Sequence, residues 1–271
     1  AVAPDVSGFT ILATLPGVYV AEDIQLWEVL GACEMENKFS VFALDPATQS
    51  RVGMPIFRAR EKSDCLHRQC CGPARAFNME VATCDPARSP FMHLMRPFKC
   101  TCACFNRGVL YTQSAAHEDL GEVYNPWACC SFNYEIRSPT THRGTDYGPV
   151  RTLPQIESDG KIGKWYDVEA TACQPGLFCS LPCGPCKEIV FDIKDGKTGA
   201  VCGKLAKVWS SCAKEALTDK SNFICIFPPD ATPYQKATLL SAVFLIDFTM
   251  FEENRKPRDG DMGGAGGGGG F

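Results

Sequence analysis

Short runs of alternating apolar and polar residues recur along most of this chain. In residues 188–194, for example, Ile189, Phe191 and Ile193 lie on one side of an extended chain, which is the period of a strand with one buried face. Asp-Pro, Gly-Pro and Asp-Gly pairs separate the runs and favour turns. The pattern predicts eleven strands, at residues 38–44, 54–59, 77–83, 91–96, 109–113, 121–124, 132–137, 165–170, 188–194, 201–208 and 222–227. Such a series indicates a closed or nearly closed antiparallel sheet.

One stretch near the C-terminus has a different pattern. Residues 237–251 are apolar except for Thr238, Ser241, Asp247 and Thr249, and they predict a helix over residues 234–251. Fifteen helical residues span roughly 22 Å, which is short of the roughly 30 Å of bilayer hydrocarbon, and an aspartate is costly in lipid. Because a helix that is apolar on every side is normally buried, we expect a hydrophobic helix enclosed by a β-barrel. Insertion into a membrane is the alternative.

These elements predict one mainly β domain over residues 23–253. Residues 1–22 contain Pro4, Gly8, Pro16 and Gly17 and are expected to form a flexible lead-in. Residues 138–164 are polar and rich in Pro, Gly, Thr and Arg, so they are predicted to be an inserted loop. Residues 254–271 end in a run of glycines and are expected to be a disordered tail.

The composition excludes several classes of function. Hydrophobic residues make up 45% of the 271 and charged residues 21%, which excludes general disorder. The net charge of −4 argues against the broadly basic surface that most nucleic-acid binders need, so no nucleic-acid partner is expected. Because no Gly-rich phosphate loop, Ser-His-Asp set or acid–base pair of carboxylates stands out, enzyme chemistry on a small molecule has little support.

Cysteine is the unusual component, with 17 residues. The number is odd, and the pairs Cys70-Cys71 and Cys129-Cys130 are adjacent, so a complete set of disulfides is not expected. No secretory signal opens the sequence, which favours reduced thiols in the cytoplasm. The thiols are then explained by burial, metal binding, acylation or redox chemistry.

One group of cysteines is a candidate zinc site. Cys173, Cys179, Cys183 and Cys186 are separated by five, three and two residues, and a folded loop can close such a group into a tetrahedron. The last two also match the dithiol motif of thioredoxins, but that mechanism needs the first thiol at a helix N-terminus, whereas a strand is predicted to follow here. Structural zinc therefore stays one alternative, and buried or acylated thiols stay the other.

A second group is a candidate site of lipid attachment. Cys100, Cys102 and Cys104 alternate with other residues, so in a strand neighbouring thiols lie roughly 6.6 Å apart on one face. Sulfurs that share a zinc ion lie within about 4 Å of one another. The spacing therefore favours a row of thiols that can carry acyl chains, two of which anchor a protein well. Packing as small apolar residues is the alternative.

Carboxylates suggest one cation site. Glu188, Asp192 and Asp195 lie close to a predicted turn and are candidate calcium ligands, although calcium prefers six to eight oxygens. A solvated strand face is the alternative interpretation.

A cluster of cations suggests a surface for lipid head groups. Lys204 and Lys207 lie close to Trp209, and each cation near an anionic membrane contributes about 1 kcal/mol. An ordinary exposed face is the alternative.

Several segments together resemble the phospholipid scramblase family, in consistent order over residues 24–253. They are LWEVL at 26–30, ENKF at 36–39, EKSDC at 61–65, RQCCGP at 68–73, RPFKC at 96–100, GEV at 121–123 with Trp127, GKLAKVW at 203–209, KEALTD at 214–219, NF at 222–223, KA at 236–237, FLIDF at 244–248 and FE at 251–252.

The resemblance implies a twelve-stranded barrel around a hydrophobic C-terminal helix, similar to the tubby proteins. It implies calcium-stimulated, ATP-independent movement of phospholipids in both directions between leaflets, without covalent catalysis. It also implies palmitoylation of the cysteines that follow the Arg-Pro motif, where Cys100, Cys102 and Cys104 stand.

The resemblance further implies attachment to the cytoplasmic face of the plasma membrane or of another cellular membrane, with anionic lipids as partners. The calcium segment has fewer carboxylates than is usual in the family, with Val190, Lys197, Thr198 and Gly199 in their place. A phosphoinositide- or lipid-binding regulatory module without transport activity is the alternative function.

Overall fold

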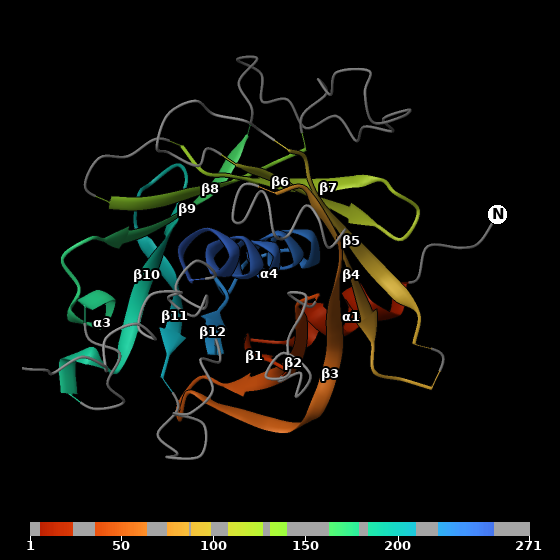
Figure 1. Cartoon of the computed structure of the whole chain (residues 1–271), viewed down its shortest axis with the longest axis horizontal. Coiled ribbons are helices and arrows are strands. Elements are labelled where there is room, and N and C mark those ends of the chain that lie inside the picture. Colours follow the sequence, from red (N-terminus) through yellow and green to blue (C-terminus); the bar gives the residue numbers. More distant parts are fainter. Residues whose placement is uncertain are drawn as a thin grey trace, which may run out of the picture.

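Twelve antiparallel strands form a closed barrel around a central helix in the computed structural model (Figure 1). The structure describes residues 6–23, 36–63, 75–86, 88–98, 108–126, 131–139, 163–178, 184–209 and 222–251. Strands adjacent in the chain are adjacent in the barrel, and β1 closes it by pairing with β12. The strands are β1 (Gly17–Glu22), β2 (Lys38–Asp45), β3 (Ser50–Lys62), β4 (Phe77–Thr83), β5 (Pro90–Arg96), β6 (Val109–Ser114), β7 (Asp119–Tyr124), β8 (Ser131–Arg137), β9 (Lys164–Thr171), β10 (Glu188–Asp195), β11 (Val201–Val208) and β12 (Asn222–Ile226).

The predicted fold class and all eleven predicted strands are confirmed, as β2 to β12. The prediction of a flexible lead-in over residues 1–22 is wrong for residues 6–22, which form α1 (Val6–Thr14) and β1. The local pattern of β1 is weak, and its place depends on pairing with β12, where Gly17 faces Ile226. A Cβ on Gly17 would lie 2.7 Å from the Cys225 carbonyl oxygen, so this glycine serves strand pairing and not flexibility.

The C-terminal helix lies inside the barrel, as predicted from its apolar surface. Helix α4 (Pro233–Ile246) begins with a capping box, in which the Thr232 side chain accepts from the Gln235 backbone, and it continues as a π-helical turn, η5 (Asp247–Phe251). Every residue from Lys236 to Ile246 is buried, because the sheet surrounds the helix on all sides (Figure 1). Within the described residues, none of the helices has the length and hydropathy that a membrane-spanning helix needs.

Two hydroxyl groups of the C-terminal helix contact strands β6 and β8. Thr112 of β6 donates to Ser241 at 2.8 Å, and the hydroxyls of Tyr134 and Thr249 lie 2.7 Å apart. Burial raises the pKa of Tyr134 to about 12, so the phenol stays protonated at neutral pH. These contacts explain why the apolar run of the helix is interrupted at Ser241 and Thr249.

The barrel has two ends with different contents. We call the end at which α4 begins the N mouth and the end at which η5 finishes the C mouth. Helix α1 lies at the N mouth, where Phe9 packs edge-on against Phe91 and Tyr234 at 5.2 and 5.4 Å. The ammonium of Lys236 donates to the carbonyls of Ala13 and Leu15, each at 2.8 Å. The N mouth is therefore covered by α1.

Two predicted segments lie mostly outside the described residues. They are the inserted loop, of which residues 140–162 are not described, and the tail over residues 254–271. The ends of β8 and β9, at Arg137 and Lys164, flank the predicted loop at the N mouth.

Two short helical turns lie between β9 and β10. They are α3 (Pro175–Phe178) and η4 (Gly184–Cys186). The side chain of Gln174 attaches this connector to β10, because it donates to the Val190 carbonyl and accepts from the Val190 N–H, both at 2.7 Å.

Candidate functional site

Buried charged side chains surround the last turn of the central helix at the C mouth. Glu61 of β3 is 0% exposed and Arg75, just before β4, is 1% exposed. The two form a double contact, with Nε–Oε1 at 3.0 Å and Nη2–Oε2 at 3.2 Å. The guanidinium of Arg75 also lies 4.6 Å from the centre of the Phe248 ring, within the range of a cation–π contact. The pair therefore joins β3 and the start of β4 to the end of the helix.

Two further cations lie in the same region. Lys207 of β11 is 4% exposed, and its Nζ lies 3.7 Å from the centre of the Phe251 ring and 4.7 Å from that of Trp209. Arg96 of β5 is also buried, with its guanidinium 5.9 Å from the Phe77 ring. Because the C-terminal end of a helix carries partial negative charge, cations are favourable there.

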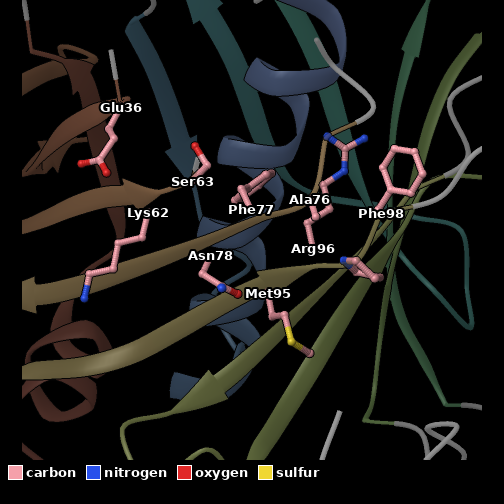
Figure 2. Close-up of a pocket in the computed structure, with 10 residues that line it drawn as sticks. Glu36, Lys62, Ser63, Ala76, Phe77, Asn78, Met95, Arg96 and Phe98 are labelled. Atoms are coloured by element: carbon pink, nitrogen blue, oxygen red, sulfur yellow. The ribbon is translucent and has the colours of Figure 1, made fainter. Parts of the chain in front are cut away.

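An open groove of 570 Å³ lies at the rim of the C mouth, beside Arg96 (Figure 2). Lys62, Asn78 and Met95 form a row on the outer face of β3, β4 and β5, where Lys62 pairs with Asn78 and Asn78 with Met95. Phe98 lies beyond the end of β5 with 51% of its surface exposed. The volume is within the range of roughly 300–1,000 Å³ that is typical of ligand sites.

The lining of the groove is amphipathic. Lys62 contributes a cation that forms an ion pair with Glu80, and Glu36 contributes a carboxylate that forms an ion pair with Arg60. Arg96 lies at the inner edge of the groove and is 3% exposed. Met95 and Phe98 contribute apolar surface. This combination suits a ligand that has both an anionic group and an apolar chain, because each part meets a matching surface.

The three candidate calcium ligands do not form one site. Glu188 accepts from Lys204 at 2.8 Å, whereas Asp195 holds the β10–β11 turn by accepting from the backbone and hydroxyl of Thr198. The Thr198 backbone hydrogen bond is the largest cause that lowers the pKa of Asp195. Glu188 and Asp192 stand four strand positions apart, or roughly 13 Å. Among the described residues, no group of three or more His, Cys, Asp or Glu is placed to hold a metal.

The predicted head-group surface is wrong in one respect, because Lys204 and Lys207 do not share a face. Lys204 lies on the outer face of β11 in an ion pair with Glu188, and Lys207 points inward beside Trp209. Residues three apart in a strand point to opposite sides of the sheet. A single outer surface therefore cannot contain both ammonium groups.

The cysteine predictions fall partly outside the described residues. Cys173 is exposed and Cys186 is partly exposed, whereas Cys179 and Cys183 lie outside the described part of the chain. Cys100, Cys102 and Cys104 also lie outside it. Zinc binding and acylation therefore stay predictions.

The sequence pattern carries a signal for the buried charges at the C mouth, although none of them is among the predicted site residues except Lys207. In β3 the inward positions are Phe57, Ala59 and Glu61. Arg96 likewise follows the inward residue Leu94 in β5. A charged residue at a position where the alternation calls for an apolar one marks a buried polar site.

A closed antiparallel barrel with a hydrophobic C-terminal helix as its core defines the fold class of this chain. Comparison with known proteins gives the family. The sequence model of the Scramblase family matches residues 1–145 and 162–253, so the chain belongs to the Scramblase family. The unmatched residues 146–161 fall inside the predicted inserted loop.

Individual relatives agree with this assignment. Phospholipid scramblase 1 of Mus musculus is 31% identical over 260 residues, which cover 93% of this chain and 67% of the relative. Phospholipid scramblase 2 of Bos taurus is 30% identical over 253 residues, which cover 92% of this chain and 72% of the relative. The human Phospholipid scramblase 1 is 28% identical over 248 residues, which cover 90% of this chain and 66% of the relative. The chain thus spans about two thirds of the length of these relatives, and no solved structure matches it.

Proposed function

We propose that this chain is a phospholipid scramblase, which moves phospholipids in both directions between membrane leaflets without ATP and without a covalent step. The observation that carries the proposal is the family match over residues 1–145 and 162–253. The relatives named phospholipid scramblase align with 90–93% of the chain, so the match includes the barrel, the central helix and the C mouth.

The physical task of a scramblase is to lower the cost of moving a polar head group through hydrocarbon. The groove at the C mouth supports this role, because the exposed ammonium of Lys62 is suited to a phosphate while Met95 and Phe98 are suited to an acyl chain. A head group that enters the groove would keep charged partners while its chains keep apolar ones.

The distribution of charge in the barrel core constrains the route that a lipid head group can take. Charged side chains surround the last turn of α4, whereas its middle consists of fully buried apolar residues such as Leu240, Val243 and Phe244. In the described part of the core, no row of charges leads from one mouth to the other. We therefore propose that head groups pass along the rim of the C mouth and not through the barrel.

The test is a vesicle assay. The purified chain is reconstituted into vesicles that carry a labelled phospholipid in both leaflets, and an impermeant quencher is added. Empty vesicles should lose about half of the signal, and vesicles with the chain should lose nearly all of it. A rate equal to that of empty vesicles, with and without calcium, would overturn the proposal.

A matched pair of variants tests the groove. Lys62→Glu reverses a charge in the groove and should slow the exchange several-fold, because it repels the lipid phosphate. Lys197→Glu makes the same change in the β10–β11 turn at the N mouth and should leave the rate unchanged. Equal effects of the two variants would exclude a specific role of the groove.

The groove also supports a second candidate function, which is binding of anionic lipid without transport. Salt-sensitive binding to anionic vesicles with no exchange between leaflets would select this function.

Calcium stimulation and palmitate at Cys100, Cys102 and Cys104, with attachment at the cytoplasmic face of a membrane, remain part of the proposal. Because Asp192 shares no described metal site, the vesicle assay on Asp192→Ala decides whether calcium acts through β10. A blunted calcium response would assign calcium to this strand.

A further inference from the structure

Opposite charges face each other at one end of the groove. The register of β2 and β3 continues beyond the start of β2, because the Glu61 N–H donates to the Asn37 carbonyl oxygen at 2.9 Å. Glu36 therefore stands opposite Lys62, and both line the groove (Figure 2). Residues that face each other in this way have Cβ atoms roughly 5 Å apart. A carboxylate and an ammonium group are thus presented to the groove as near neighbours.

This end of the groove is electrically balanced. Arg60 donates from Nε to the Glu36 carboxylate at 3.0 Å, and Lys62 forms an ion pair with Glu80. The Arg60 and Lys62 side chains are 62% and 59% exposed. Exposed ion pairs contribute little to stability, so a ligand can rearrange them. Two carboxylates beside two cations match a head group that carries both signs better than one with a net charge.

The groove continues from the charged end to an apolar end. Lys62 pairs with Asn78, and Asn78 pairs with Met95. Because neighbouring strands are roughly 4.8 Å apart, Met95 lies roughly 10 Å from Lys62 along this row. In Figure 2, Glu36 and Lys62 lie on one side of the groove and Phe98 lies on the other. A single lipid can therefore place its head group at the charged end and an acyl chain along Met95 and Phe98.

We propose that the groove binds phospholipids whose head group carries a primary ammonium beside the phosphate, as in phosphatidylethanolamine. The phosphate contacts the ammonium of Lys62, and the head-group ammonium contacts the carboxylate of Glu36. A two-carbon bridge joins the two charged groups of this head group, which keeps them as close together as facing side chains of a sheet. The inference rests on the proposed function, because it names the lipid class that the groove of the scramblase takes.

The same chemistry ranks other head groups below ethanolamine. The quaternary ammonium of choline has no N–H, so it cannot donate a hydrogen bond to Glu36, whereas a primary ammonium has three donors. The head group of phosphatidylglycerol has no cation at all, and its net negative charge faces the Glu36 carboxylate. The expected order of affinity is ethanolamine, then choline, then glycerol.

The first experiment measures binding without a membrane. Dihexanoyl phosphatidylethanolamine, phosphatidylcholine and phosphatidylglycerol are titrated into the full chain below the concentrations at which they form micelles, and the heat of binding is recorded. The ethanolamine lipid should bind several-fold more tightly than the glycerol lipid. Equal affinities, tighter binding of the glycerol lipid, or no binding of any of the three would overturn the inference.

Variants of Glu36 test the role of the carboxylate. Glu36→Gln should abolish the preference for ethanolamine over glycerol, and Glu36→Lys should reverse it. Glu169→Gln is the matched control, because Glu169 forms an ion pair with Lys194 outside the groove and its side chain is of similar exposure, 36% against 27% for Glu36. The control should keep the preference of the unaltered chain. An unchanged preference in Glu36→Gln, or an equal loss in Glu169→Gln, would overturn the inference.

The second experiment repeats the vesicle assay with each of the three lipids labelled on an acyl chain, so that the head group stays intact. The ethanolamine lipid should exchange several-fold faster than the glycerol lipid, and Glu36→Gln should bring the two rates together. Equal affinities with equal exchange rates for all three lipids would overturn the head-group preference and leave scrambling intact. Selective binding of the ethanolamine lipid without exchange of any lipid would support the binding site and overturn scrambling.

Discussion

Replacing Glu61 by glutamine removes one charge from the buried pair that joins β3 to the end of the central helix. Besides its two contacts with Arg75, Glu61 accepts hydrogen bonds from the Asn37 backbone and from the Ser63 hydroxyl. Glutamine retains one acceptor oxygen but places an N–H donor against those of Arg75. The change leaves a guanidinium that is 1% exposed without its counter-charge.

The expected cost is large. Removing one partner of a buried ion pair costs about 3–5 kcal/mol, against a total stability of about 5–15 kcal/mol for a domain. At about 2–4 °C per kcal/mol for a domain of this size, the midpoint of thermal unfolding should fall by roughly 6–20 °C. Equilibrium urea unfolding, followed by far-ultraviolet circular dichroism, measures the free energy of unfolding directly.

Two control variants show whether the stability lost in Glu61→Gln comes from the unpaired buried charge. Glu80→Gln makes the same chemical change in the more exposed Glu80–Lys62 pair and should cost less than about 1 kcal/mol. The double variant Glu61→Gln with Arg75→Met removes both charges while methionine still covers Phe248, so it should be more stable than Glu61→Gln alone. A cost below about 1 kcal/mol for Glu61→Gln, or a double variant less stable than the single one, would refute the reasoning.

Three other changes test the helix packing, the α1 cover and the lowered pKa of His93. Gly121→Ala should cost about 1–3 kcal/mol in urea unfolding, because a Cβ there would lie 2.5 Å from the Thr238 hydroxyl oxygen. Lys236→Met should cost about 1–3 kcal/mol and speed the hydrogen exchange of α1 amides, because its ammonium donates to two carbonyls of that segment. Burial, and next the charge of His117, lower the pKa of His93 from 6.5. The unfolded chain therefore binds the proton more tightly, and stability should fall as the pH drops through 6.5.

A specific outcome would contradict each of these three predictions. Thr238→Ala should restore part of the stability lost in Gly121→Ala, and no restoration would exclude a clash at this contact. Unchanged exchange of α1 in Lys236→Met would mean that aromatic packing alone holds α1. His93→Gln should flatten part of the acid limb of the stability curve, so an identical curve would assign that limb to other groups.

The positions of most strands could be predicted from the sequence, because the alternation of side chains along a strand depends only on neighbouring residues. Each strand from β2 to β12 presents alternate side chains to one core, and a period of two is visible without knowledge of the partner strand. The first strand is not predicted, although Val18 and Val20 do alternate inward in it. It is only six residues long, and the Pro4, Gly8, Pro16 and Gly17 of the same segment favour a loose lead-in.

The candidate site was predictable only in part, because its contacting residues come from distant parts of the chain. The inward positions of Glu61, Arg96 and Lys207 follow from the alternation of their strands. Their partners do not, because Arg75 lies beyond a connector and Phe248 belongs to the helix. Closeness in sequence predicts one surface for Lys204 and Lys207, whereas the pleat puts them on opposite faces of β11.

The sequence by itself determined eleven of the twelve strands, the central helix and the family resemblance. Only the tertiary structure decided which charged side chains meet. Glu61 lies in β3, Arg75 lies just before β4 and Phe248 belongs to the C-terminal helix, yet the three are in contact. They meet because the sheet closes around the helix and brings the ends of β3 and β4 to its last turn. No local pattern encodes that closure.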